Sequence, residues 1–321
     1  MGVFNVSHLS NYTCIVPQTS MHVQAPSTNG STGQKTTGDV IDPEASSVLF
    51  FSDNDNCNGI ERQQKHPDWV EGQASDGTAS DGTPDYGFAY NTGDSTKGEI
   101  EWDFRESDIA LSGDCVLAMG VSGVYNNKRA VRIFRRRDRN GADLPADAYY
   151  SVWFYFPEAV SFDVSATDGD GSKRFGFWNV FQIKNRVNGN SLANLSVDAG
   201  MVTGREDSMH FNIWKKSLCG GTEECDGAES ISADTKISIP LRKWVHLEMY
   251  LKASQGPDGQ LVVWQDGQEI INFSGQTERT GAAKREWSVN NYGQLHRPAS
   301  HTLFVDDVLI STSPVHTLLF D

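Results

Sequence analysis

Short segments that alternate between polar and apolar residues recur along this chain from residue 99 onward, and they restrict the fold more than any other feature. Between residues 244 and 251 every second residue is Val, Leu or Met, and the positions between them hold Trp, His, Glu and Tyr. A period of two is that of a strand with one buried face. Segments with helical periodicity are scarce. The segments predicted to form strands are 99–104, 116–121, 129–137, 149–156, 175–184, 193–198, 208–215, 244–252, 260–265 and 302–311.

Clusters of Gly, Asp and Asn separate these segments, and the Asp266-Gly267 pair is typical of a tight hairpin. Many short strands with turn signals between them predict an all-β fold, a two-sheet antiparallel β-sandwich or jelly roll. Residues 46–321 are expected to form this domain. Residues 1–45 are rich in Ser, Thr, Gly and Asn, so we expect a polar arm or linker that gains order only against another chain.

Composition excludes several classes of protein. The chain holds 33 aromatic residues (Phe 16, Tyr 9, Trp 8), which is enough for a substantial core, and general disorder is therefore excluded. No apolar run of about 18 residues occurs, so no membrane insertion is expected. The first 17 residues lack a basic start followed by an apolar stretch, so they do not predict a signal peptide.

A formal net charge of −15 argues against a nucleic-acid-binding protein, because phosphates would be repelled. One segment differs: residues 128–139 hold seven of the 27 basic residues. Such a cluster can bind carboxylates, sulfates or phosphates, and Arg132 and Arg136 are its candidate ligands. The alternative is a solvated strand end whose arginines pair with the abundant aspartates.

The five cysteines fit an oxidising compartment, and an extracellular or cell- or virion-surface location is predicted. Cys219 and Cys225 bracket a short Gly-containing loop that a disulfide can close. Cys57 and Cys115 could form a second bridge, which would leave Cys14 unpaired or joined to another chain. A Cys-x-x-Cys motif is lacking, so a zinc site is not expected.

The segment FWNVFQIKN at 177–185 is the most informative one for function. Strict alternation would place Phe177, Phe181 and Ile183 in the core, and Trp178, Gln182 and Lys184 on the opposite face. A ring for stacking beside an amide and an ammonium group suits a sugar polymer. An ordinary half-buried strand with a wet polar face is the alternative.

Four parts of the chain resemble the polysaccharide-lyase-like branch of the concanavalin A-type jelly rolls, the group that includes glucuronan lyase and heparin lyase I. Together they span roughly residues 99–312. The resemblance implies two curved antiparallel sheets and a concave face that holds a glycan chain. Its segments are YYSVWFYFP at 149–157, FWNVFQIKN at 177–185, KWVHLEMY at 243–250 followed by WQDG at 264–267, and NNYG at 290–293 followed by FVDDV at 304–308.

The resemblance also implies β-elimination on a uronic-acid polymer, which needs a group that binds the substrate carboxylate, a base for the C5 proton and an acid for the leaving oxygen. Gln182 fits the first role. Lys184 stands where several such lyases have histidine, and it is expected to be the base or a second carboxylate clamp. His210 and Tyr292 are the other candidates for proton transfer. Candidate substrate contacts are Trp178, Arg132, Arg136, Asn212 and Trp214.

Oxygen-rich loops raise the question of calcium. Asp53 and Asp55 lie in one such loop, and residues 168–171 form another. The fold often holds one structural calcium ion near its first and last strands, so Asp306 joins the candidate ligands. Plain turns rich in Asp, Asn and Gly are the alternative interpretation.

Taken together, the sequence favours an extracellular lyase that cleaves an acidic polysaccharide. Two other interpretations stay open. One is a non-catalytic carbohydrate-binding module, and the other is a structural subunit of a surface or virion assembly that associates through the N-terminal arm.

Overall fold

The computed structural model describes residues 47–52, 86–92, 100–125, 127–136, 142–163, 176–187, 190–202, 205–216, 228–230, 237–282 and 284–320. Within these residues the chain is almost entirely β-structure, and every strand pair is antiparallel.

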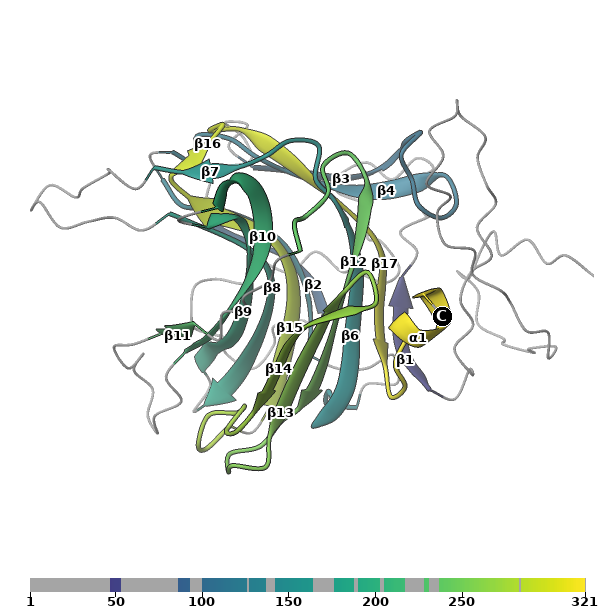
Figure 1. Cartoon of the computed structure of the whole chain (residues 1–321), viewed down its shortest axis with the longest axis vertical. Helices are drawn as coiled ribbons and strands as arrows, with labels where there is room; N and C mark the ends of the chain where they lie inside the picture. The colour runs from purple at the N-terminus through teal and green to yellow at the C-terminus, as the bar shows by residue number, and fades with distance from the viewer. Residues whose placement is uncertain are drawn as a thin grey trace, which may run out of the picture.

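Two large sheets lie face to face (Figure 1). The eight-stranded sheet has the order β14-β13-β12-β6-β17-β4-β3, and β1 also pairs with β17. Its strands are β1 (Val48–Ser52), β3 (Ile100–Glu106), β4 (Cys115–Val121), β6 (Asp147–Tyr155), β12 (Trp244–Lys252), β13 (Gln260–Gln265), β14 (Gln268–Ser274) and β17 (His301–Ser311).

The second large sheet has seven strands in the order β11-β10-β9-β8-β15-β5-β2. A small third sheet pairs β7 (Ser161–Phe162) with β16 (His296–Arg297). The strands of the seven-stranded sheet are β2 (Tyr86–Thr92), β5 (Arg129–Arg135), β8 (Phe177–Val187), β9 (Asn190–Val202), β10 (Arg205–Lys216), β11 (Ala228–Ser230) and β15 (Lys284–Gln294).

The hydrophobic core fills the space between the two large sheets, because alternate residues of each strand point inward. On β12 the inner residues are Val245, Leu247, Met249 and Leu251, each at most 1% exposed. The predicted β-sandwich is therefore confirmed. The Asp266-Gly267 hairpin is confirmed too: it joins β13 to β14, with backbone φ angles of 48° and 76° at its two residues.

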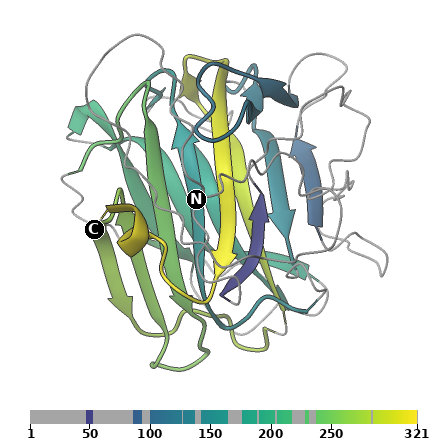
Figure 2. The ribbon, with the colours of Figure 1, turned by 90° about the vertical axis from the view of Figure 1, so that its right-hand side faces the viewer.

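A short helix, α1 (His316–Phe320), lies across the outer face of the eight-stranded sheet (Figure 2). Its Leu319 packs into a second apolar cluster with Trp153, Leu309 and Val315. The buried carboxylate of Glu248 accepts the backbone N–H groups of Val315 (2.9 Å) and His316 (3.1 Å). Glu248 thus satisfies N–H groups that the start of a helix leaves without a partner.

Several predictions fall on residues that the structure does not describe. They are the polar arm (1–45), the Cys219–Cys225 disulfide and the Asp53 and Asp55 ligands. Cys115, on β4, is buried and disulfide-bonded, and its partner is outside the described residues. In the described part of the chain, no helix is both long and apolar enough to cross a membrane.

Three buried histidines make the fold sensitive to acid. Burial lowers the pKa of His246 and of His301 to about 3, and that of His296 to about 4. In the unfolded chain all three histidines titrate near pH 6.5. Below that pH the unfolded state therefore binds protons that the folded state does not bind. We expect the free energy of unfolding to fall by about 1 kcal/mol per histidine for each pH unit below about 6.5.

Denaturant titrations at about pH 7.5 and about pH 5.5 test this expectation. His246→Gln should reduce the pH dependence, because the amide removes one titrating group and can still bond to the Ser151 hydroxyl, which lies 2.6 Å from Nε2 of His246. Equal midpoints at the two pH values would contradict the prediction.

Candidate active site

The outer face of the seven-stranded sheet, the face turned away from the core, carries most of the predicted site residues. One row of residues runs across five neighbouring strands and shows the arrangement. Its members are opposite one another in register, and they are Trp214, Ser196, Gln182, Ser288 and Phe134.

A β-bulge in β8 changes which residues reach this outer face. Asn179 is opposite Asp198 and Phe181 is opposite the adjacent Val197, so β8 carries one extra residue at this point. Both Val180 and Phe181 therefore point into the core. The alternation predicted for 177–185 holds after the bulge and is inverted before it.

Gln182 and Lys184 consequently lie on the outer face, as predicted, and Trp178 does not. The Trp178 ring is 1% exposed, packs in the core and donates its indole N–H to Oδ1 of Asn291 at 2.8 Å. The prediction that Trp178 offers a stacking surface beside Gln182 and Lys184 is wrong, because the bulge turns it inward.

Other aromatic rings occupy the outer face instead. The half-buried rings of Phe177 and Tyr292 meet edge to face with centroids 4.9 Å apart. The guanidinium carbon of Arg132 lies 5.3 Å from the centre of the Tyr292 ring. An aromatic pair with a cation over one ring is a surface on which a sugar can pack.

A charged cluster lies farther along the same face. Lys184 and Glu286 are opposite each other on β8 and β15, and the Lys184 amine is 3.2 Å from Oε1 of Glu286. The other oxygen of Glu286 accepts the Nε–H of Arg136 at 2.7 Å. The Glu286 side chain is 4% exposed and that of Lys184 is 14% exposed, so Lys184 is the more accessible of the two.

Burial and charge shift the protonation of both groups. Burial first, and then the positive charges of Arg132 and Arg136, lower the pKa of Lys184 to about 8, although Glu286 acts in the opposite direction. Burial alone would raise the pKa of Glu286, but Lys184, Arg136 and Arg132 outweigh it and lower that pKa to about 2. Lys184 is therefore an amine that titrates in mildly alkaline solution beside a permanently ionised carboxylate.

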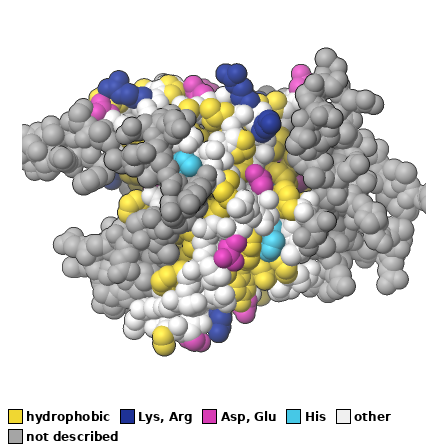
Figure 3. Space-filling view, in the orientation of Figure 1, with side chains coloured by type: hydrophobic (Ala, Val, Ile, Leu, Met, Phe, Trp, Pro, Cys, Tyr) yellow, Lys and Arg dark blue, Asp and Glu magenta, His cyan; other side chains and the backbone are white. Residues whose placement is uncertain are grey.

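Gln182 lies two residues before Lys184 and is 7% exposed. Its amide nitrogen donates to the hydroxyl of Ser196 at 3.0 Å, which fixes the orientation of the side chain. Arg132 and Arg136 are also nearly buried, at 5% and 6% exposed. Because both guanidinium groups are nearly buried, the positive charge of this cluster is held within the sheet face. Figure 3, in the orientation of Figure 1, shows a different side of the molecule, where Lys and Arg side chains are scattered among the described residues.

His210 is on the outer face but away from Lys184. It is opposite Gly200 on β9, seven residues from Ala193, which is opposite Lys184, so about 20 Å of strand separates them. Its ring nitrogens lie 2.8 Å from the Ser208 hydroxyl and 2.9 Å from the Ile237 carbonyl. His210 is a predicted candidate for proton transfer, which requires it to lie near Lys184, and the structure contradicts this placement. Its bonds to Ser208 and Ile237 give it a structural role instead.

Tyr292 is likewise separated from Lys184 along the face. It lies six residues from Glu286 on β15, which corresponds to about 20 Å of strand. Asn212 and Trp214 are half-buried on β10, in register with Asp198 and Ser196. The outer face is thus a long polar strip with the charged cluster at one end and the aromatic pair toward the other.

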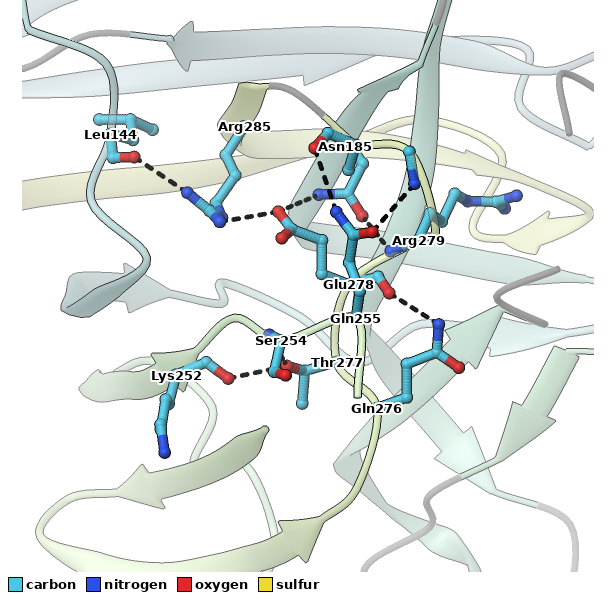
Figure 4. A network of polar contacts seen from close by, with 12 residues as sticks. Leu144, Asn185, Lys252, Ser254, Gln255, Gln276, Thr277, Glu278, Arg279 and Arg285 are labelled. Carbon is cyan, nitrogen blue, oxygen red and sulfur yellow. Dashed lines mark hydrogen bonds and ion pairs between the residues drawn. The ribbon is translucent and has the colours of Figure 1, made fainter. Parts of the chain in front are cut away.

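On the inner side of the sheet, a second carboxylate fixes the strands that carry the charged cluster (Figure 4). Asn185 follows Lys184 on β8, and Arg285 precedes Glu286 on β15. Asn185 and Arg285 are opposite each other in register. Oε1 of Glu278 accepts bonds from Asn185 (3.2 Å) and Arg285 (2.8 Å), and Asn185 accepts the backbone N–H of Arg279 at 3.0 Å. Because both strands are held at this pair, the neighbouring outer pair is held in register as well.

Asp306 is in a different part of the molecule, on β17 in the eight-stranded sheet. Its Oδ2 accepts the backbone N–H of Leu111 at 3.0 Å and its Oδ1 accepts that of Asp307 at 2.9 Å. Burial and the charge of Asp307 raise its pKa well above the usual value. Its carboxylate is thus engaged in backbone contacts, and no group of three or more His, Cys, Asp or Glu side chains that could hold a metal occurs among the described residues.

The inward position of Trp178 yields a stability prediction. Trp178→Ala should lower the free energy of unfolding by about 3–5 kcal/mol, because it removes a core ring and leaves a cavity. Trp214→Ala is the matched control: the same change on the half-buried outer face should cost much less. Urea titration of both variants measures the difference, and equal stability losses would place Trp178 outside the core.

Comparison with known proteins supports the fold. No family model and no curated protein sequence matches this chain. Among solved structures, endo-β-1,4-glucuronan lyase from the fungus Trichoderma reesei is similar at 12% identity, with a TM-score of 0.51, over 67% of this chain and 88% of that chain.

Two further solved structures have lower TM-scores, and no conclusion about this protein rests on them. A marine alginate lyase from Aplysia kurodai shares 12% identity over 66% of this chain and 87% of that chain, with a TM-score of 0.39. An endo-β-galactosidase from Clostridium perfringens shares 8% identity over 83% of this chain and 62% of that chain, with a TM-score of 0.46. The glucuronan lyase confirms the resemblance to polysaccharide-lyase jelly rolls as a likeness of fold.

Proposed function

We propose that this protein is an extracellular polysaccharide lyase that binds a uronic-acid polymer on the outer face of the seven-stranded sheet. The observation that carries this proposal is the placement of Lys184 beside Gln182 and Arg136 on that face, with a pKa lowered to about 8. The similar fold of a glucuronan lyase supports the substrate class. The disulfide bond of Cys115 supports an oxidising location.

The charge of the site suits a carboxylated sugar. The chain as a whole carries a formal charge of −15, and a polyanion would be repelled by most of its surface. Around Glu286, however, the cations Lys184, Arg132 and Arg136 outnumber the carboxylate. Arginine and amide side chains on one sheet face can hold a sugar carboxylate through several N–H donors.

The proposed reaction needs one proton transfer in each direction. Neutral Lys184 takes the C5 proton of the uronate, and the electrons of the C–H bond form the C4–C5 double bond as the C4–O bond breaks. Bonds from Gln182 and Arg136 to the substrate carboxylate stabilise the negative charge that develops there. The Lys184 ammonium then returns the proton to the leaving oxygen, so that the products are an unsaturated uronate and a new hydroxyl end.

A non-catalytic glycan-binding module is the second candidate. The half-buried rings of Phe177 and Tyr292 on the same face favour it, because such rings bind sugars without any chemistry. A calcium ion as a structural cofactor and self-association through the N-terminal arm also stay proposals, because their residues are largely outside the described part of the chain.

The lyase proposal is tested by replacing the base. Lys184→Ala should lower turnover on the preferred uronic-acid polymer by about 100-fold or more, while the fold survives. The assay follows the absorbance of the unsaturated product over a panel that includes polyglucuronate and alginate. Lys252→Ala is the matched control, because Lys252 is 44% exposed and pairs with the exposed Asp258 at 3.6 Å.

Full elimination activity in Lys184→Ala would remove this residue from the reaction. Binding of a polymer without any elimination product in the unaltered protein would favour the binding module instead.

The pH dependence gives a second test. Because the base must be neutral, and its pKa is lowered to about 8, kcat/KM should rise with pH and level off above about pH 8. Below that value the rate should fall about tenfold per pH unit, as the amine becomes protonated. Initial rates from about pH 6 to about pH 9.5 measure the curve, and a rate that is constant or declines over this range would exclude Lys184 as the base.

A further inference from the structure

We propose that Glu286 is a positioning residue for Lys184: its carboxylate accepts one N–H of the amine and thereby directs the nitrogen lone pair toward the substrate. This inference rests on the lyase activity proposed above. The inference goes beyond that activity, because it assigns a role to Glu286, a buried acid that takes no proton from the sugar.

The geometry holds the carboxylate in place from both sides. Oε1 lies 3.2 Å from the Lys184 amine and Oε2 lies 2.7 Å from Nε of Arg136. Glu286 is on β15, between β8, which carries Lys184, and β5, which ends one residue before Arg136, and its side chain is 4% exposed. A carboxylate held in this way cannot turn away from the amine without breaking the bond to Arg136.

The surroundings of Lys184 show what balances its charge. On β9 the residue opposite Lys184 is Ala193, which does not titrate. Two positions farther along this pairing Lys284 on β15 is opposite Arg186 on β8, and the Lys284 amine is 3.6 Å from a carboxylate oxygen of Asp143. Arg132 and Arg136 act on Lys184 from the β5 side. Of the groups named, Glu286 is the one carboxylate bonded to the Lys184 amine.

Removing this carboxylate therefore has a defined consequence. With Glu286 replaced by the neutral Gln, burial and the two arginines would act on Lys184 without opposition, and the pKa of the amine should fall below about 8. A purely structural ion pair predicts the same fall in pKa together with lower stability, because removing one partner of a buried pair is destabilising in itself. It differs in turnover: kcat above the Lys184 midpoint would then not change, since the neutral amine would need no partner to direct it.

The test measures Lys184 directly in the full chain. Lysines labelled with ¹³C at Cε are titrated by NMR, and the Lys184 signal is assigned by its absence in Lys184→Arg. We expect a midpoint near the value of about 8 in the unaltered protein and a decrease of about one unit or more in Glu286→Gln. The rise of kcat/KM with pH should move by the same amount.

Glu278→Gln is the matched control, because it removes a buried carboxylate of the same sheet region that bonds Arg285 on the inner side. It should lower stability and leave the Lys184 midpoint unchanged. If Glu286→Gln does not fold, Glu286→Asp keeps the charge and withdraws it from the amine, and a reduced kcat with a nearly unchanged midpoint is then expected.

The outcomes separate the two proposals. An equal Lys184 midpoint in the unaltered protein and in Glu286→Gln, or a kcat unchanged by Glu286→Asp, would overturn the role of Glu286. Absence of elimination product from every polymer would overturn the lyase function, and the NMR titration would still decide whether Glu286 controls Lys184.

Discussion

The antiparallel pairing of β8 with β15 is the contact on which both the core and the outer charged cluster depend. The pair Asn185–Arg285 points inward and is held by Glu278, and the adjacent pair Lys184–Glu286 points outward. A shift of one residue in this pairing would exchange the two faces. The inner ion pair therefore does more than satisfy buried charge, because it determines which side chains meet on the outer face.

The outer cluster shows how an acidic protein can present a site for an acidic polymer. Basic side chains that were spread over the surface would be screened by salt and opposed by the net charge of −15. Here Arg132 and Arg136 are nearly buried and act over short distances on Lys184 and Glu286. Burial makes these charges costly. It also lowers the pKa of the Lys184 amine, so that more of the amine is neutral and able to accept a proton near neutral pH.

The sequence predicts the two-sheet fold because alternation is preserved in most strands, β12 being the clearest case. It cannot predict the bulge in β8, since no Gly or Pro marks it and every residue from Val180 to Ile183 is compatible with regular alternation. The placement of Trp178 fails for that reason, while Gln182 and Lys184, which follow the bulge, are placed correctly.

The sequence does not predict strand β15, because polar residues occupy its outer face and one inward position is polar as well. That inward residue is Asn291, which bonds the Met119 carbonyl and the Trp178 indole. Glu286 is missed with it. The separation of His210 from Lys184 depends on register across three strands, which alternation within each strand does not determine. Helix α1 is too short for its period to be visible, and a carboxylate distant in sequence, Glu248, holds its first turn.

The outer face of the seven-stranded sheet is the proposed glycan site, and a crystal structure of Lys184→Ala with a uronic-acid oligosaccharide would show where the sugar binds. We predict sugar rings along β8, β15 and β5, with one carboxylate against Gln182 and Arg136 and a ring several sugar units away near Tyr292. An oligosaccharide bound on the eight-stranded sheet, or at the sandwich ends away from Lys184, would rule out this face as the site.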